Sequence, residues 1–149
     1  MTKTSPTAVP SRVSEPTLYI LMRTDMDSMN PGKAMAQAAH AANAFIHDVT
    51  RPEAYSVAIH AAVEEWENST RQGFGTTITL AVPAEREMDE IVNAAAEDNL
   101  PAAVIHDPTY PLRDGAVTHL LPINTCAYVF TPCRVTHPVS ALAGLELHP

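Results

Sequence analysis

The chain has 149 residues, of which 46% are hydrophobic and 17% are charged, and this is enough for one globular domain with a real core. Its formal net charge of −8 argues against broad nucleic-acid binding, which needs clustered cations to meet phosphates, and we expect no DNA partner. The apolar runs are too short to span a bilayer, so we expect no membrane partner.

Residues 1–16 mix proline, serine and threonine and contain no apolar segment of the kind found in signal peptides. We interpret them as a flexible tail in front of a domain at 17–149. Cys126 and Cys133 form neither a close metal-ligand pair nor a disulfide framework, and the histidines show no metal-ligand spacing. We therefore expect a reducing, cytoplasmic setting and a protein without metal or cofactor.

Short β-branched or apolar runs predict strands, and apolar residues spaced three and four apart predict helices. The expected strands are residues 17–23, 76–82, 102–107, 116–122 and 126–131, the last two joined at Asn124. The expected helices are residues 31–45, 50–66, 83–98 and 138–147, and residues 108–115 are expected to form a loop. Strands that alternate with helices indicate an α/β sandwich around a parallel or mixed sheet.

Two of the helix starts carry recognisable capping residues. Asn30 is a good N-cap, and Pro31 suits the first helical position because its missing N–H would be unpaired there. Thr50 and Glu53 have the spacing of a capping box and predict the start of the second helix.

One face of the first helix carries polar residues. Lys33, Gln37 and His40 are spaced i, i+4 and i+7, so they share a face, which is either a solvated stripe or part of a site. Lys33 is the only lysine outside the tail, and it lies at a helix N-terminus, where backbone N–H groups favour an anion. In α/β sheets, sites form beyond the carboxyl ends of strands, and Asp107 ends the strand at 102–107. An aspartate before a proline also simply starts turns, and this alternative stays open.

The chain resembles the type-II peptidyl-tRNA hydrolases, whose first strand ends in Arg-x-Asp and leads to G-K-x-x-A-Q-x-x-H-A. The residues that match this pattern are Arg23, Asp25, Gly32, Lys33, Ala36, Gln37, His40 and Ala41. The segments TTITLAVP and NLPAAVIHD are also similar to the family. The resemblance implies a three-layer α/β/α sandwich around a four-stranded or slightly larger mixed sheet, usually in a homodimer. It also implies hydrolysis of the ester that joins a peptide to the 3′ end of tRNA, which recycles the tRNA.

The resemblance implies roles for the matched residues. Asp107 is expected to orient or deprotonate water, and Lys33 to hold charge on the substrate or the oxyanion. A second active-site threonine corresponds to Thr125 or Thr118, and Thr125 fits better by its distance from the chain end. The residues expected to bind substrate are Gln37, His40, Arg23 and Asp25.

The chain also departs from the family. After its aspartate the family has Ala-Gly-Arg-Thr, whereas this chain has Pro108, Thr109, Tyr110 and Pro111, so the arginine and the threonine are missing. The segment before the next strand is longer, as if a hairpin arm had been added. These departures and the acidic composition leave a second hypothesis open, in which the protein is a non-catalytic module on the same fold that binds a protein or a small ligand.

Overall fold

The structure is a computed structural model that describes residues 15–133 and 140–149. Its elements are β1 (Thr17–Arg23), α1 (Pro31–Val49), α2 (Val57–Asn68), β2 (Thr77–Val82), α3 (Glu85–Glu97), β3 (Ala102–Asp114), β4 (Val117–Thr131) and the 3₁₀ helix η1 (Ser140–Gly144). Most of the expected tail, residues 1–14, lies outside the described residues.

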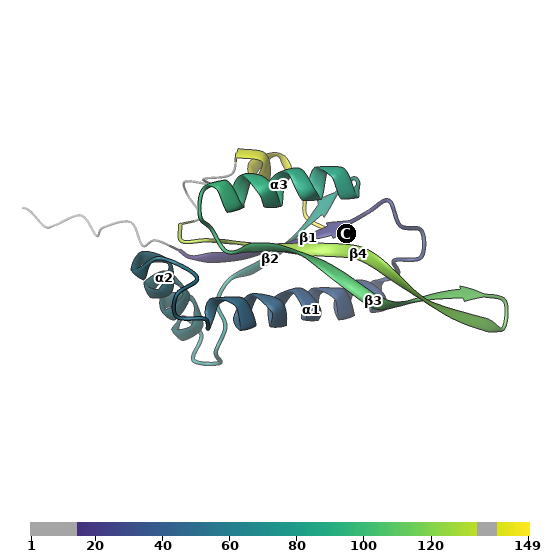
Figure 1. Ribbon diagram of the computed structural model, residues 1–149, viewed down its shortest axis with the longest axis horizontal. Helices are drawn as coiled ribbons and strands as arrows, with labels where there is room; N and C mark the ends of the chain where they lie inside the picture. The colour runs from purple at the N-terminus through teal and green to yellow at the C-terminus, as the bar shows by residue number, and fades with distance from the viewer. Residues whose placement is uncertain (1–14, 134–139) are drawn as a thin grey trace, which may run out of the picture.

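The four strands form one sheet in the order β2-β1-β4-β3. β1 pairs in parallel with β2 and antiparallel with β4, and β3 pairs antiparallel with β4. Helices α1 and α2 cover one face, and α3 with η1 covers the other (Figure 1). The predicted three-layer sandwich around a four-stranded mixed sheet is therefore confirmed. No helix among the described residues is long and apolar enough to cross a membrane.

The central strand and the helix after it form as their sequences predict. β1 is buried along its whole length except for partly exposed Arg23, because both faces of the sheet are covered. Asn30 caps α1 by accepting a hydrogen bond from the Lys33 N–H at 2.9 Å, and Pro31 takes the first helical position. These two residues fix where the first turn of α1 begins relative to the carboxyl end of β1.

An aromatic cluster joins α1 and α2 to the sheet. The Phe45 ring is fully buried and lies 5.5 Å from the Trp66 ring and 5.0 Å from the Phe130 ring, measured between centroids. Trp66 also donates its indole N–H to the main-chain oxygen of Thr76 at 2.8 Å. The cluster therefore holds the C-terminal half of α1 against β4.

The predicted start of the second helix is wrong. Thr50 ends α1, because its N–H bonds to the carbonyls of Ile46 and Asp48. Helix α2 begins after Ser56, whose hydroxyl oxygen accepts the Ile59 N–H at 3.3 Å. The Thr50 and Glu53 spacing thus matches a capping box by sequence alone, while the backbone of Thr50 is already used to close the preceding helix.

The predicted loop at 108–115 and the break at Asn124 are also wrong. β3 continues to Asp114 and β4 starts at Val117, so the two strands form a hairpin arm that extends beyond the rest of the sheet (Figure 1). Pro108, Pro111 and Pro122 are compatible with these strands because the arm has unpaired edges, where a missing N–H breaks no ladder. Gly115 turns the chain with a φ of +57°, which favours glycine.

The predicted C-terminal helix at 138–147 is shorter in the structure. Only η1 is helical there among the described residues, and 138–139 lie outside them. After η1 the chain turns along the edge of the sheet, where Leu147 bridges to Leu80 of β2. Pairing with this free strand edge replaces the helix turns that the sequence predicts.

We expect Phe45→Ala to lower the free energy of unfolding by about 3–5 kcal/mol, because it removes a fully buried ring and leaves a cavity. Phe74→Ala is the matched control, since Phe74 is 47% exposed, and it should cost no more than about 0.5 kcal/mol. Urea unfolding followed by Trp66 fluorescence measures both. Equal losses in the two variants would contradict this account of the core.

Candidate active site

The pairing of β3 and β4 is irregular next to the predicted site. Ile105 pairs with Cys126, but His106 pairs with Asn124, so Thr125 is an extra residue in β4. Because of this bulge, Thr125 and Cys126 both reach Gln37 of α1, although neighbours in a regular strand point to opposite faces. The bulge therefore turns the Thr125 hydroxyl toward α1.

A second irregularity lies across the ladder, in β3. Asp107 pairs with Ile123 and Tyr110 pairs with Leu121, so β3 carries one extra residue between them. The chain here folds around the carboxylate: Asp107 Oδ1 accepts the Thr109 N–H at 2.9 Å and the Thr109 hydroxyl at 3.2 Å. This is a turn of the kind that an aspartate before a proline forms, and the same aspartate faces α1.

Gln37 connects the two irregular strands through its side-chain amide. Its Nε2 donates to Asp107 Oδ2 at 2.6 Å, and its Oε1 accepts from Thr125 Oγ1 at 2.6 Å. A carboxylate can only accept, so the amide nitrogen must face Asp107, the amide oxygen must face Thr125, and the Thr125 hydroxyl must donate. We call Gln37, Asp107 and Thr125 the amide bridge.

The amide bridge is buried: Gln37 is 3% exposed, Asp107 is 7% exposed and Thr125 is fully buried. Cys126 beside it donates its thiol to the Gln37 main-chain oxygen at 3.4 Å, and burial raises the pKa of this thiol to about 12. The thiol is therefore neutral and serves packing. With both ends of its amide bonded, Gln37 positions its two partners.

Asp107 is ionised at neutral pH. Burial raises the pKa of its carboxyl, but the Thr109 N–H, the Gln37 amide, the Thr109 hydroxyl and the nearby charge of His40 all lower it. Together these contacts hold the pKa of Asp107 below its usual range. The site thus contains a carboxylate that is held in one orientation by neutral donors.

Lys33 lies on the same side of the sheet, one turn before Gln37. Its ammonium Nζ donates to the main-chain oxygen of Pro111 at 2.6 Å and lies 4.9 Å above the centre of the Tyr110 ring. Tyr110 is fully buried, and its hydroxyl meets Ser28 Oγ at 3.1 Å. Lys33 and Gln37 therefore reach β3 from the same helix, Lys33 at Pro111 and Gln37 at Asp107.

His40 stands at the opening of this site. It is exposed and lines a pocket of about 290 Å³ together with Asp107, Pro108 and Thr109. The imidazole and the carboxylate thus share one pocket. His106, the neighbour of Asp107 in sequence, is exposed, lines the same pocket and contacts Asn124 Oδ1 at 2.9 Å.

The structure does not bring Arg23 and Asp25 to the amide bridge. The Arg23 guanidinium binds the Asp25 carboxylate through Nε at 2.9 Å and Nη2 at 2.8 Å, and its Nη1 reaches Glu85 Oε2 at 2.9 Å. Nη1 also donates to the main-chain oxygen of Asn124 at 2.7 Å, next to the bulge at Thr125. The contacts of Arg23 thus anchor β1, α3 and β4 to one another.

Two further placements bear on the sequence hypotheses. Thr118 is exposed in the arm, where it pairs with Arg113, whereas Thr125 belongs to the amide bridge. Sequence reasoning missed Thr109 and Tyr110. The order Asp-Pro-Thr was the one sequence signal that could have indicated Thr109, because it allows the turn around Asp107.

Among residues 15–133 and 140–149 no group of three or more His, Cys, Asp or Glu side chains is placed to hold a metal ion.

We expect Gln37→Leu to raise the pKa of Asp107, because it removes one donor to the carboxylate and keeps the site buried. The free energy of unfolding at pH 7 should fall by roughly 1.5–3 kcal/mol, the cost of leaving a buried carboxylate and a hydroxyl without this partner. Carboxyl NMR titration and urea unfolding measure the two effects. Gln72→Leu, at an exposed position, is the matched control and should change neither.

The sign of the pH dependence follows from the lowered pKa. A carboxyl whose pKa is lower in the folded chain adds stability above its unfolded pKa, and this stability is lost as the pH falls through the folded value. The stability difference between the wild type and Gln37→Leu should therefore shrink below the ordinary aspartate pKa of about 3.9. A difference that stays constant down to the acid limit would show that the carboxylate is not the group affected.

Comparisons with known proteins identify the family of this chain. The family model described as Peptidyl-tRNA hydrolase PTH2 matches residues 17–129. The chain is also similar to a peptidyl-tRNA hydrolase of Sulfurisphaera tokodaii, with 31% identity over 90 residues that cover 60% of this chain and 69% of the relative. The matched family range includes α1, β3 and β4 up to residue 129, and thus all three residues of the amide bridge. The chain therefore belongs to the peptidyl-tRNA hydrolase PTH2 family.

Proposed function

We propose that the protein hydrolyses the ester bond between the peptide and the 3′ end of tRNA in peptidyl-tRNA, without a cofactor. Family membership supports this reaction. The observation that carries the assignment of residues is the buried Gln37 amide, which holds the Asp107 carboxylate and the Thr125 hydroxyl in one fixed arrangement. Lys33 supplies a positive charge on the same side of the sheet.

In this proposal Asp107 orients the attacking water. Each carboxylate oxygen has two acceptor positions, and Gln37 occupies one on Oδ2. A carboxylate with a lowered pKa is a weak base, so it suits a water that it holds in line and that loses its proton as the new bond forms. The pocket beside His40 leads to this carboxylate and provides room for the water and the ester.

Lys33 and Thr125 take complementary tasks. The ammonium has three donors, and one of them is used on Pro111, so two remain for the oxyanion that forms on the ester carbonyl. The Thr125 hydrogen is committed to Gln37, so its oxygen can only accept. Because Thr125 is fully buried, it acts through Gln37, which it helps to orient toward Asp107, and it does not stabilise the oxyanion.

We expect Lys33→Ala to keep the fold and to lower kcat/KM by about 10²–10³, the usual cost of removing one oxyanion donor. Asp107→Asn should give a comparable loss, and the double variant should lose much less than the product of the two, since both serve one step. The assay is release of tRNA from purified peptidyl-tRNA. The control is Arg86→Ala, which removes one positive charge from α3 on the opposite face of the sheet and should keep activity.

These variants distinguish the two functions that the sequence leaves open. A folded wild type that releases no tRNA would contradict the hydrolase and favour a binding module on the same fold. Wild-type turnover in Lys33→Ala would remove this residue from the chemistry. Raised salt should weaken the reaction with a shallow slope, because few cations are available to meet phosphates.

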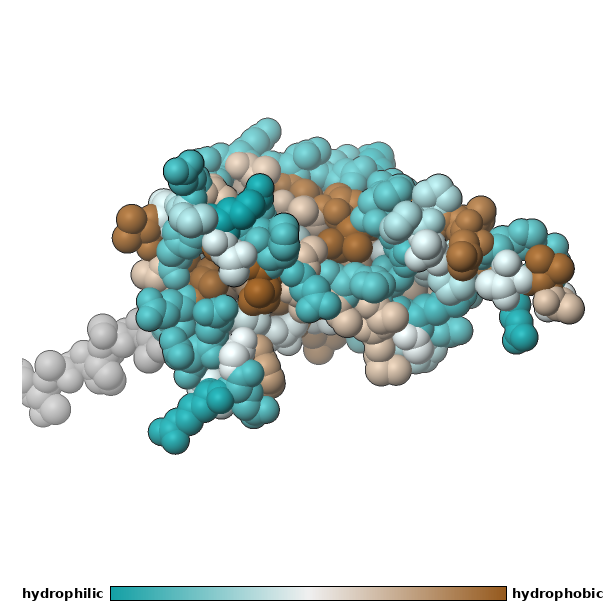
Figure 2. Space-filling view, turned by 60° about the horizontal axis from the view of Figure 1, so that its bottom comes forward, coloured by the Kyte–Doolittle hydropathy of each residue, from teal (hydrophilic) through white to brown (hydrophobic). Residues whose placement is uncertain are grey.

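The proposal includes a homodimer in the cytoplasm, as the family resemblance implies. The arm supports a second copy as its partner, because Val117, Leu120 and Leu121 are 56%, 61% and 39% exposed there, and Figure 2 shows apolar side chains along it. A two-stranded hairpin is marginally stable alone, so covering these side chains would stabilise the arm. A reducing setting suits a chain that has only two cysteines.

We expect sedimentation velocity to give twice the mass of the chain for the wild type. Leu120→Lys should shift the protein toward the monomer, because a charge in the interface is costly to bury. Val57→Lys, at an exposed apolar position of α2, is the matched control and should leave the dimer intact. A wild type that sediments as a monomer at all concentrations would contradict the dimer and leave the hydrolase proposal in place.

A further inference from the structure

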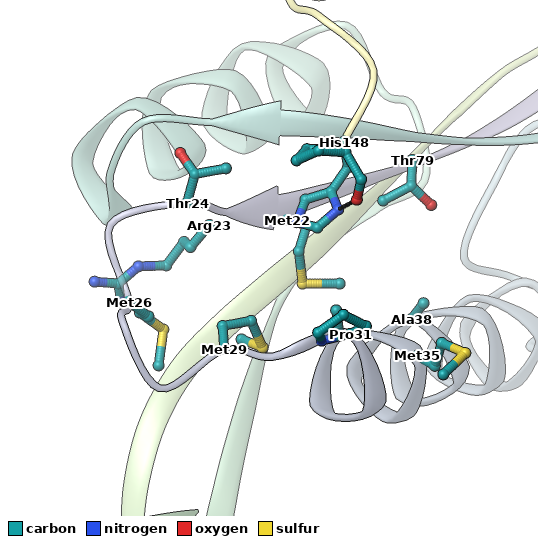
Figure 3. A pocket seen from close by; sticks show the side chains of 12 residues that line it. Met22, Arg23, Thr24, Met26, Met29, Pro31, Met35, Ala38, Thr79 and His148 are labelled. Atoms are coloured by element: carbon teal, nitrogen blue, oxygen red, sulfur yellow. Dashed lines mark hydrogen bonds between the residues drawn. The ribbon is translucent and has the colours of Figure 1, made fainter.

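A second cavity lies on the other side of the first turn of α1. It has a volume of about 560 Å³ and is open to solvent. Its lining is rich in methionine: Met22 extends from β1 toward α1, Met26 and Met29 come from the connecting loop, and Met35 comes from the helix (Figure 3). Four of the six methionines of the chain thus line this one cavity.

Helix α1 lies between this cavity and the amide bridge, and its side chains contribute to both. Pro31, Ala34, Met35 and Ala38 line the cavity, whereas Lys33, Gln37 and His40 lie on the side toward β3. At 100° per residue these two sets of side chains point in clearly different directions from the same turns. One helix therefore forms a wall of both sites.

Direct contacts run from one site to the other. Met29 lines the cavity, and its Sδ lies 3.8 Å from the Tyr110 hydroxyl. The ring of this tyrosine lies under the Lys33 ammonium, at 4.9 Å. A ligand that spans from Lys33 to the cavity therefore stays in contact with the protein along the first turn of α1.

Gly32 lies in the first turn of α1 and has no side chain. It stands between Pro31, which lines the cavity, and Lys33. The fold does not need glycine here: the backbone has no positive φ, and a Cβ would meet only Asn30 Oδ1 at 3.5 Å, an ordinary contact. Glycine in a helix is less favourable than alanine, so its presence fits a requirement for open space. A peptide chain can pass over this surface without a steric obstacle.

We propose that the methionine-lined cavity receives an apolar side chain of the peptide in peptidyl-tRNA, an inference that rests on the proposed function. An α-helix with its side chains is about 10–12 Å across, and an extended chain advances about 3.3–3.6 Å per residue. The residue that enters the cavity is therefore about the third before the ester. Methionine side chains are flexible and polarisable, so one cavity can accept apolar side chains of different shapes.

Two matched substrates test this inference. They are tRNA carrying acetyl-Leu-Gly-Gly and tRNA carrying acetyl-Gly-Gly-Gly, which differ by one side chain at the third position. We expect the leucine substrate to have a KM lower by about tenfold, the effect of burying most of one leucine side chain, with similar kcat. Equal KM values for the two substrates would overturn the inference while leaving hydrolysis established.

Variants locate the effect. Met35→Glu places a charge at the edge of the cavity, and the fold should tolerate it because Met35 is 69% exposed. It should bring the KM of the leucine substrate to that of the glycine substrate and leave kcat unchanged. Val57→Glu adds the same charge at an 86% exposed position of α2 and should preserve the tenfold difference. Loss of the difference in both variants would overturn the assignment to the cavity.

A binding measurement separates this inference from the proposed function. In protein labelled at the methionine methyl groups, the product peptide acetyl-Leu-Gly-Gly should shift the signals of Met26 and Met35. The signal of Met88 should stay in place, because this methionine is fully buried in the core. Unmoved cavity signals would overturn the inference. Shifts in a wild type that cleaves neither substrate would refute the hydrolase and support the cavity as a site for apolar peptide side chains.

Discussion

The geometry of this protein depends on one buried amide. The side chain of Gln37 extends from α1 to the sheet, between the Asp107 carboxylate and the Thr125 hydroxyl. Its amide nitrogen donates to the carboxylate, and its amide oxygen accepts from the hydroxyl. Buried polar groups without partners are costly, so α1 cannot slide or rotate over β3 and β4 without losing both hydrogen bonds. The position of Lys33, one turn earlier on the same helix, follows from this constraint.

The strands are distorted to satisfy that amide. A regular antiparallel ladder would turn Thr125 away from the face that Cys126 presents to α1, and the extra residue in β4 removes this alternation. The extra residue in β3 lets Thr109 fold back on Asp107. Each bulge interrupts the regular pairing of β3 with β4. Together the two bulges bring polar side chains from both strands to the same glutamine.

Much of this arrangement could be predicted where the signals were local. The bounds of β1, the Asn30 cap of α1 and the buried face of α3 all follow from short-range patterns of burial and capping. The shared face of Lys33 and Gln37 follows from helical spacing. The sequence also singled out Asp107, but for a reason that the structure corrects: it predicted a strand end there, whereas β3 continues to Asp114 and Asp107 lies at a bulge within it.

The rest could not be predicted because it depends on long-range pairing. Pro108 and Pro111 indicate a loop by local rules, yet they lie in β3 because the arm leaves its edges unpaired. Nothing near Thr50 in the sequence shows that its N–H already closes the preceding helix. The bulge at Thr125 is a property of two strands together, and so neither strand shows it alone.

Charge limits how such a site can hold its substrate. Arg23, Arg51 and Arg86 are each paired with carboxylates, so among the described residues few cations are available for phosphates. The chain as a whole carries a net charge of −8, and the contribution of counterion release to affinity is correspondingly small. Contacts with the peptide can then add to the affinity for a peptide joined to tRNA. Apolar surface next to the chemistry is the physical means for this, and the methionine-lined cavity on the far side of α1 supplies it in a form that does not depend on one peptide sequence.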